Sequence, residues 1–538
     1  MAAIPGAAVP CFAFRRASRT RALIGGALAA LALLSAGLAW LFVLSPGPVS
    51  AHAATAGPRQ QVEVIIQLRR GVDVARGRAL VRSLGGQPGV DLPIINGLSA
   101  RLAAGAERRL AASPLVRVVS LNAPIRETTL TGATPWTLAT SFDRSTGASK
   151  LWSRSTGAGV GVAVIDTGID GDLPDFQTSQ GSSTSRVIAS AVIDPNATTA
   201  DDGYGHGTAV AGLVAGNGWY RDSGDPLYGQ YAGTAPDANL ISIKVSDDSG
   251  GATTLDAIYG LQFAVDHKSD YNIRVVNLSF RSMSAQSYTT DPLDAAVEQA
   301  WLHGITVVAA AGNLGSAPDA VSYAPANDPY VITVGATDNQ GTASTWDDVE
   351  ASWSSRGETQ DGISKPDVLA PGAHIVTTLA PGSSFAAACP TCVIGGAYFQ
   401  LSGTSLAAPI VAGIAADLLA AHPRWTPAMV KGAIVNTATS VPGGESEVNA
   451  MGAYWAGGPE LASDQGLTPN DLIDPGTNSI DYDAASWSAA SWSTAADPLA
   501  ASWSAASWSC LDCSSGDGGD INPTAASWSD VGWASSWG

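Results

Sequence analysis

The sequence predicts an α/β protein built on a mostly parallel sheet, because short apolar strand-like runs alternate with apolar helical stretches. Residues 160–165 (VGVAVI) form a β-rich run typical of a strand buried in a parallel sheet. Residues 206–212 begin an Ala/Val/Gly-rich helix, and residues 405–421 predict a longer one with Leu406, Ile410, Ile414 and Leu418 four apart. A helix that is apolar nearly all round is expected to be buried and closely packed.

Charge divides the 538-residue chain into two parts. Residues 1–127 hold 15 Lys+Arg and 5 Asp+Glu (net +10), whereas residues 128–538 hold 13 and 42 (net −29). We therefore expect two separately functioning parts, and no nucleic-acid partner for the larger one. The acidic excess suits solubility outside the cell or, alternatively, cation binding.

The N-terminus predicts export. Arg15, Arg16, Arg19 and Arg21 precede an apolar span at 22–44, and Ala51-His52-Ala53 is a small-x-small cleavage pattern. Residues 1–54 are interpreted as a signal peptide. The alternative is an uncleaved membrane anchor, since the span is long enough to cross a bilayer. Either way the bulk of the chain is expected to be extracellular, free or associated with the cell surface.

Four of the five cysteines form two C-x-x-C pairs, Cys389/Cys392 and Cys510/Cys513. Zinc is one interpretation, but the long gap between the pairs and the exported setting favour disulfides, with three connectivities open.

Residues 61–122 predict a small ferredoxin-like α+β module. Alternating apolar residues at 62–68, a helix at about 74–84, a strand at 95–102, a short helix at 105–112 and a strand at 116–121 come close to β-α-β-β-α-β, with one strand unassigned. The Thr/Ser/Ala/Pro-rich stretch that follows, assigned as 128–147, predicts a linker or cleavage region.

Three residues combine into a candidate catalytic group. Asp166 follows the strand at 160–165, at the carboxyl end where open α/β sheets place their sites. His206 stands between glycines, which let the backbone approach closely. Ser405 begins the core helix, where backbone N–H groups favour negative charge, and Pro409 is expected in the first turn. An imidazole activates a serine hydroxyl, and a carboxylate fixes the imidazole tautomer.

These motifs resemble the subtilisin family (subtilases, peptidase family S8) of serine endopeptidases. The matching segments are 163–170 (AVIDTGID), 205–208 (GHGT) and 403–409 (GTSLAAP), in the Asp–His–Ser order. The resemblance covers about 148–440 and implies a three-layer α/β fold with a mostly parallel sheet. It implies hydrolysis of protein or peptide substrates without a cofactor for the chemistry.

The resemblance also implies residue roles. Asn313, after the strand-like run 305–311, matches the asparagine that donates to the oxyanion. An extended peptide would bind by strand addition. The substrate-binding residues implied are Ser249, Gly250, Gly251, Ser279, Phe280, Arg281 and Gly312.

Two residues depart from the family. Arg281 stands where a glycine is usual, and we expect it either to narrow the groove or to favour acidic substrate residues. Ala209 replaces a histidine outside the triad.

Residues 55–127 resemble the family's inhibitor-I9-like prosegment, an intramolecular chaperone and inhibitor that is removed on maturation. Structural calcium is implied as an option, with Asp175 as the matching ligand position.

The segment 441–538 predicts an acidic low-complexity tail. Ala-Ala-Ser-Trp-Ser occurs five times, starting at 484, 489, 500, 505 and 525. The tryptophan faces could stack on glycans or cell-wall material, which makes a surface-binding protein the alternative function; an extension without a partner is equally compatible.

Overall fold

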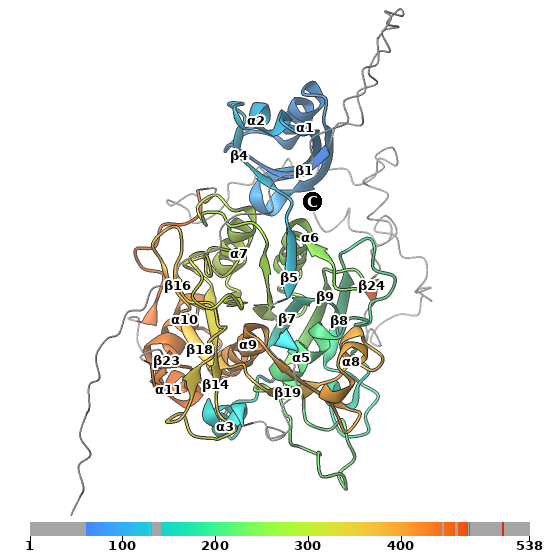
Figure 1. Cartoon of the computed structure of the whole chain (residues 1–538), viewed down its shortest axis with the longest axis vertical. Helices are drawn as coiled ribbons and strands as arrows, with labels where there is room; N and C mark the ends of the chain where they lie inside the picture. The colour runs from blue at the N-terminus through green and yellow to red at the C-terminus, as the bar shows by residue number, and fades with distance from the viewer. Residues whose placement is uncertain are drawn as a thin grey trace, which may run out of the picture. The chain divides into compact units, whose positions relative to one another are not determined.

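A wide sheet with strand order β22-β23-β18-β14-β13-β11-β7-β9-β8-β24 organises the larger part of the chain (Figure 1). Neighbours from β8 to β18 all run parallel, which confirms the predicted mostly parallel sheet. The computed structural model describes residues 61–127, 130–131, 141–443, 446–457, 461–471, 473 and 508–509. The parallel strands are β7 (Gly161–Asp166), β8 (Val187–Val192), β9 (Asn239–Lys244), β11 (Ile273–Leu278), β13 (Thr306–Ala310), β14 (Ile332–Asp338) and β18 (Val368–Pro371).

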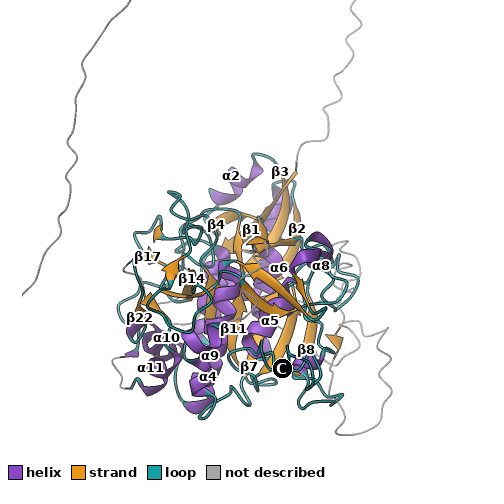
Figure 2. Ribbon diagram, turned by 60° about the horizontal axis from the view of Figure 1, so that its bottom comes forward, coloured by secondary structure: helices purple, strands orange, loops and turns teal. Residues whose placement is uncertain are grey.

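Helices cover both faces of this sheet and complete the three layers (Figure 2). Val162 and Val164 of β7 pack with one set of helices, while Ala163 and Ile165 pack with the other set on the opposite face. This is the two-residue alternation of a strand buried on both sides. The first set comprises α5 (His206–Ala215), α9 (Thr404–Ala421), α10 (Pro427–Asn436) and α11 (Ala450–Trp455); the second comprises α6 (Thr254–Asp266) and α7 (Pro292–Leu302).

Helix α9 is buried along its length, as its composition predicts. Among the described helices it alone is long and apolar enough to cross a membrane, and 89% of that stretch is buried inside the protein. Pro409 is the sixth residue of α9, so the expectation that it lies in the first turn is wrong. Packing holds the helix together past the proline, because its neighbours are buried on every side.

A four-stranded antiparallel sheet with order β2-β3-β1-β4 carries the predicted small α+β module. Its unassigned strand is β2. Ile65, Leu92, Ile94 and Ile95 of the module belong to the same hydrophobic core as α6 and α7. The elements are β1 (Gln61–Leu68), α1 (Val74–Ser83), β2 (Gln87–Leu92), η1 (Pro93–Ile95), β3 (Gly97–Ala103), α2 (Ala106–Ala111) and β4 (Val116–Leu121).

Short elements complete the described chain. Those between the module and β18 are β5 (Pro124–Glu127), β6 (Leu130–Thr131), α3 (Phe142–Ser145), α4 (Ala148–Leu151), η2 (Pro174–Phe176), β10 (Ala252–Thr253), β12 (Phe280–Ser282), β15 (Val349–Glu350), β16 (Gly357–Glu358) and β17 (Ser364–Lys365). Those after it are β19 (Ile375–Thr378), α8 (Ser384–Ala388), η3 (Pro390–Cys392), β20 (Val393–Ile394), β21 (Tyr398–Ser402), β22 (Thr439–Ser440), β23 (Ser446–Glu447) and β24 (Trp508–Ser509).

The packed region extends beyond the expected bounds 148–440 on both sides. Helix α3 precedes it, and β23, α11 and the segment around Asn470 follow it. Asn470 is fully buried, and its backbone N–H donates to both carboxylate oxygens of Glu298 at 2.9 and 2.8 Å. The segment is rich in Gly, Pro and Asp and has no periodicity, so sequence pattern alone does not identify it as packed.

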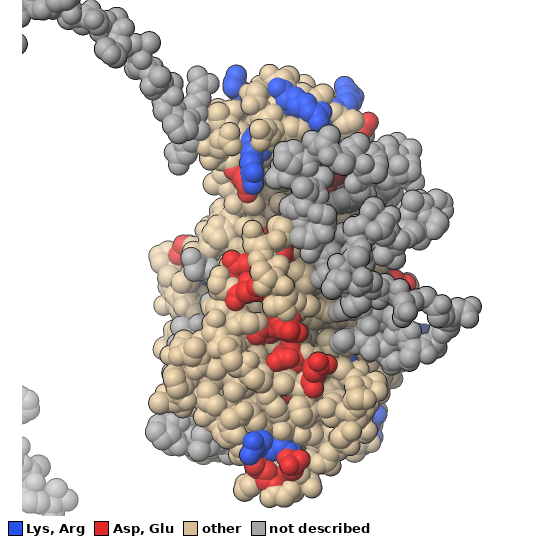
Figure 3. Space-filling model, turned by 90° about the vertical axis from the view of Figure 1, so that its right-hand side faces the viewer, with Lys and Arg blue, Asp and Glu red and all other residues tan. Residues whose placement is uncertain are grey.

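Cys389 and Cys392 form a disulfide, whereas Cys510 and Cys513 lie outside the described residues. The predicted signal peptide or anchor also lies outside them, as do the tail repeats except for Trp508 and Ser509. These two residues form β24, which pairs antiparallel with β8. On the face drawn in Figure 3, Lys and Arg side chains gather over the small module, and Asp and Glu side chains run down the larger part.

Four carboxyl groups lie together around the start of α7. Asp291 caps the helix by accepting the Leu293 N–H at 2.7 Å, and Asp294, Glu298 and Asp328 are buried beside it. Burial, followed by the charges of Asp291, Asp328 and Glu298, raises the pKa of Asp294 well above its usual value. An acidic side chain whose pKa is raised by folding makes the folded state most stable where that group is protonated.

We therefore predict that Asp294→Asn leaves stability near pH 4 almost unchanged and raises it at pH 8. In wild type, the stabilisation of the folded state by protonated Asp294 is full below the unfolded pKa of about 3.9. It declines as pH rises toward the higher pKa of the folded state. Unfolding midpoints between pH 4 and 8, measured in a Ser405→Ala background, check this. Asp222→Asn, at an exposed site, is the matched control and should show no such trend. Parallel midpoint curves for wild type and Asp294→Asn would contradict the prediction.

Candidate functional site

Asp166 and His206 form a buried pair at the carboxyl edge of the sheet. Asp166 is the last residue of β7 and His206 is the first of α5. His206 Nδ1 lies 2.7 Å from Asp166 Oδ1, and the two side chains are only 1% and 3% exposed. A Cβ atom on the next residue, Gly207, would lie 2.1 Å from the Gly168 carbonyl oxygen. The glycine is therefore what allows α5 to start so close to β7.

Asp202 fixes the backbone around His206. Its carboxylate accepts the N–H groups of Gly205 and Thr208, both at 2.7 Å, and the Thr167 hydroxyl at 2.8 Å. Thr167 Oγ1 in turn accepts the Gly207 N–H at 2.9 Å. Burial raises the pKa of Asp202 despite these hydrogen bonds. The carboxylate supplies the partners that the first N–H groups of a helix lack, and so holds the imidazole in place.

Ser405 is the second residue of α9 and is fully buried. Pro409 has no N–H, so the Ser405 carbonyl loses the helical donor four residues ahead. The Ser279 hydroxyl, just beyond β11, donates to this carbonyl at 2.8 Å and itself accepts the Asn277 side-chain amide at 2.8 Å. The turn of α9 that carries Ser405 is thus attached directly to the end of β11.

Asn313 lies beside this turn. Its Oδ1 accepts the N–H and the hydroxyl of Thr404, both at 3.1 Å, and the Thr404 Oγ1 accepts the Gly312 N–H at 3.0 Å. With its carbonyl oxygen held by Thr404, the side-chain amide group of Asn313 faces away from α9. A side-chain amide fixed in this way is the kind of neutral donor that stabilises a negative oxygen.

The chain's own strand β5 occupies a groove at this site. β5 pairs antiparallel with β10 on one side, Ile125 opposite Ala252, and with β12 on the other, Glu127 opposite Phe280. A small pocket there is lined by Asp166, His206, Gly250, Ser279, Phe280 and Ile125, among others. Ser249 and Gly251 lie in a turn in which Asp247 accepts both of their N–H groups. The paired edge is therefore Ala252–Thr253, directly after the predicted Ser249–Gly251.

Arg281 lies in the wall between the groove and Gly312. Its guanidinium carbon is 4.5 Å from the ring centroid of Tyr323, whose hydroxyl donates to Asp319 at 2.5 Å. A Cβ atom on Gly312 would lie 3.5 Å from Arg281 Cδ. The side chain thus adds both bulk and positive charge next to the residue that precedes Asn313.

Asp175, the expected calcium ligand, is buried beside a threonine and an arginine. It is fully buried, its Oδ2 accepts the Thr378 hydroxyl at 2.5 Å, and the neighbouring cation is Arg186, which donates to the Asp175 backbone carbonyl at 3.0 Å. Burial raises its pKa to about 6. Among the described residues no three His, Cys, Asp or Glu side chains are grouped to hold a metal. The Thr378 hydroxyl contacts Oδ2, and Ca²⁺ prefers six to eight oxygen ligands. Calcium at Asp175 therefore stays a prediction.

The sequence predicts Asp166, His206, Ser405 and Asn313 as site residues but does not predict the residues that contact and position them. Asp202 lies three residues before Gly205, the N-cap of α5, so it is outside the position where a capping aspartate is expected. Thr404 lies in the segment 403–409, whose resemblance implies no role for it. Ser279 is expected from the resemblance to contact substrate. No local pattern shows that the Ser279 hydroxyl reaches α9.

A parallel sheet with an Asp–His pair and a helix-borne serine at its carboxyl edge defines a serine hydrolase of the subtilisin-like class. The family model described as "Subtilase family" (Peptidase_S8) matches residues 157–454, and the chain belongs to this family.

Several known proteins are similar to this chain. Serine protease AprX from Bacillus subtilis (strain 168) is 42% identical over 287 residues, which cover 52% of this chain and 61% of AprX. The match thus spans less than two thirds of AprX. Thermitase from Thermoactinomyces vulgaris is 33% identical over 311 residues, which cover 58% of this chain and 90% of thermitase. The crystal structure of fervidolysin from Fervidobacterium pennivorans, a keratinolytic enzyme related to subtilisin, aligns with a TM-score of 0.55 and 25% identity, over 74% of this chain and 62% of fervidolysin.

We predict that Thr404→Ala lowers kcat on a peptide substrate by roughly tenfold and leaves KM nearly unchanged, because Asn313 loses the contact that orients it. Thr404→Ser keeps the hydroxyl and is the matched control that should retain activity. In an Asn313→Ala background, Thr404→Ala should cost little more, because the residue that it positions is absent. Fully additive losses in the double variant would contradict this role.

Proposed function

We propose that this chain is a secreted serine endopeptidase in which Asp166, His206 and Ser405 form the catalytic triad. The buried 2.7 Å contact between His206 Nδ1 and Asp166 Oδ1, beside a groove that holds an extended strand, carries the proposal. An imidazole held by a carboxylate at Nδ1 presents Nε2 as the base. The family's other members named above as proteases support the same activity.

In this mechanism Ser405 Oγ attacks the substrate carbonyl carbon while His206 Nε2 accepts its proton. The negative oxygen that forms is stabilised by the Asn313 side-chain amide and the backbone N–H of Ser405 at the start of α9. The C–N bond then breaks as His206 returns the proton to the leaving amine. Water, activated by the same imidazole, hydrolyses the acyl-enzyme and restores Ser405.

We further propose that residues 61–127 act as a prosegment that blocks the groove until it is cleaved. β5 lies between β10 and β12, and the Tyr259 hydroxyl of α6 donates to the Asp91 carbonyl at 2.9 Å. Past the groove, Leu130 of β6 pairs with Ser402, three residues before Ser405. The bond presented to Ser405 therefore lies between Glu127 and Leu130, at the start of the expected maturation region 128–147. Removal of residues 1–54 by export is part of this proposal and rests on sequence alone.

We predict that exported wild-type protein loses its front section and that the mature chain starts at residue 128, 129 or 130. Ser405→Ala should stay uncleaved there, because the nucleophile is absent. Intact mass measurement of both proteins checks this, with Ser153→Ala, at an exposed site, as the control that should mature normally. Identical masses for wild type and Ser405→Ala would reject self-processing, and a start well beyond residue 130 would reject the proposed position.

We also propose that Arg281 favours acidic over basic substrate side chains near the scissile bond. Replacing Arg281 by Gly should lower the ratio of kcat/KM for Glu- over Lys-containing peptides by roughly fivefold, as expected for a partly exposed charge pair of about 1 kcal/mol. Tyr323→Phe keeps the ring beneath the guanidinium and should keep the ratio. If Arg281→Gly leaves the Glu/Lys ratio of kcat/KM unchanged, the charge of Arg281 does not set the preference, and only its bulk affects the groove.

A further inference from the structure

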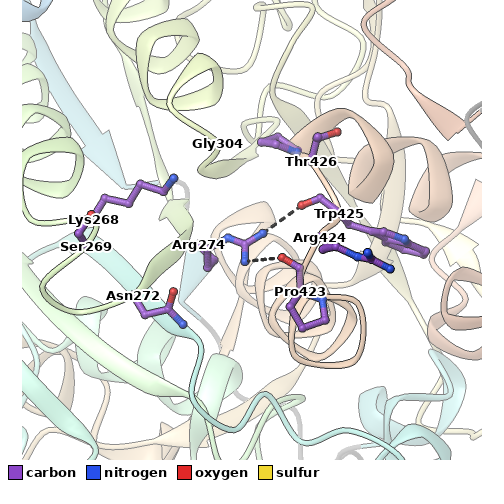
Figure 4. Close-up of a pocket in the computed structure, with 10 residues that line it drawn as sticks. Lys268, Ser269, Asn272, Arg274, Gly304, Pro423, Arg424, Trp425 and Thr426 are labelled. Carbon is purple, nitrogen blue, oxygen red and sulfur yellow. Dashed lines mark hydrogen bonds between the residues drawn. The ribbon is translucent and has the colours of Figure 1, made fainter.

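A cavity of about 400 Å³ lies at the edge of the sheet opposite the catalytic groove (Figure 4). Arg274, the second residue of β11, lines it, whereas Ser279, directly after the end of β11, lies in the groove. At about 3.3 Å per residue, the strand separates the two sites by roughly 15–20 Å. Lys268, Ser269, Asn272, Arg274 and Gly304 form one side of the cavity, and residues 423–427, which lead into α10, form the other.

Three cationic side chains line this cavity: Lys268, Arg274 and Arg424. They are three of the 13 Lys+Arg among residues 128–538, which hold 42 Asp+Glu. None of the ion pairs formed between described side chains includes any of them. The cavity is therefore a local concentration of positive charge in an acidic domain.

The contacts that hold two of these cations are with neutral carbonyl groups. Lys268 Nζ donates to the His303 carbonyl at 2.6 Å. Arg274 donates through Nη1 to the Pro423 carbonyl at 3.1 Å and through Nη2 to the Trp425 carbonyl at 3.0 Å. Carbonyl oxygens satisfy N–H groups, but they do not neutralise two like charges.

The positive charges also act on one another. Burial, and next the charge of Arg274, lower the pKa of Lys268 below its usual value. Figure 4 shows the Arg274 guanidinium directed toward the Pro423 and Trp425 carbonyl groups, with the Lys268 side chain to its left. At the margin of the cavity, Thr426 caps α10 by accepting the Met429 N–H. The positive end of the α10 dipole therefore adds to the positive potential in the cavity.

We propose that this cavity binds a multivalent oxyanion: a phosphate or sulfate group, either free or carried as an ester on a small molecule. A doubly charged tetrahedral anion offers several acceptor oxygens and relieves the repulsion between Lys268 and Arg274. The volume exceeds that of the ion itself, and Trp425, stacked on His422 with ring centroids 4.2 Å apart, provides an aromatic margin for an organic substituent. Binding here does not depend on peptidase activity.

The test uses full-length Ser405→Ala protein, which cannot digest itself through Ser405. Inorganic phosphate, at constant ionic strength set with NaCl, should raise the unfolding midpoint by about 2 °C or more at saturation, because a ligand of the folded state stabilises it. The ³¹P resonance of phosphate should broaden on addition of protein. Phenyl phosphate, tested in parallel, distinguishes the sources: at least tenfold tighter binding than phosphate indicates an ester, and equal binding indicates the free ion.

Variants locate the site. Arg424→Gln and Lys268→Gln should each lower the apparent affinity for phosphate by fivefold or more. Both the midpoint shift and the ³¹P broadening report this affinity. Arg424 is exposed, so its variant is expected to fold normally. Lys150→Gln removes one exposed positive charge away from the cavity and should respond like the parent protein. The proposal is overturned if phosphate has no effect on the parent, or if all variants respond equally.

Discussion

A missing hydrogen bond determines how Ser405, the proposed nucleophile, is held. Pro409 deprives the Ser405 carbonyl of its helical donor, and the Ser279 hydroxyl replaces that donor from the end of β11. A serine on an isolated helix would follow the fraying of its first turn. Here the turn is tied to a central strand of the sheet, so the position of Ser405 is as rigid as the sheet itself. Small displacements of reacting groups can cost large factors in rate, which makes such rigidity valuable.

The same principle extends around the site. Asp202 ties the start of α5 to the loop after β7, and Thr404 ties the start of α9 to the residues after β13. A side chain therefore bonds the start of each helix, α5 and α9, to residues that directly follow a parallel strand. Open α/β sheets gather functional residues at this edge because every parallel strand ends there. The basic cavity lies at the opposite end of β11, beside Arg274.

Sequence reasoning predicted the parallel sheet, its buried helices and the family, because each depends on patterns within a few residues. The run at 160–165, the glycines around His206 and the apolar faces of α9 are local signals. The pairing of Ser279 with Ser405 and the packing of Asn470 on Glu298 join residues 126 and 172 positions apart. No local pattern encodes such contacts. The neighbours of Asp175 could not be predicted for a related reason: the sequence shows the carboxylate but not Thr378 and Arg186 beside it.

The strand β5 in the groove and the strand β6 beside Ser402 belong to the same chain as Ser405. A substrate that is covalently attached to its enzyme encounters it at a fixed local concentration, however dilute the solution is. If Ser405 cleaves this segment, the process is first order in protein. Each molecule then matures at a rate that does not depend on protein concentration. Dilution outside the cell would then leave the timing of the first cleavage unchanged, while slowing every later encounter with another protein.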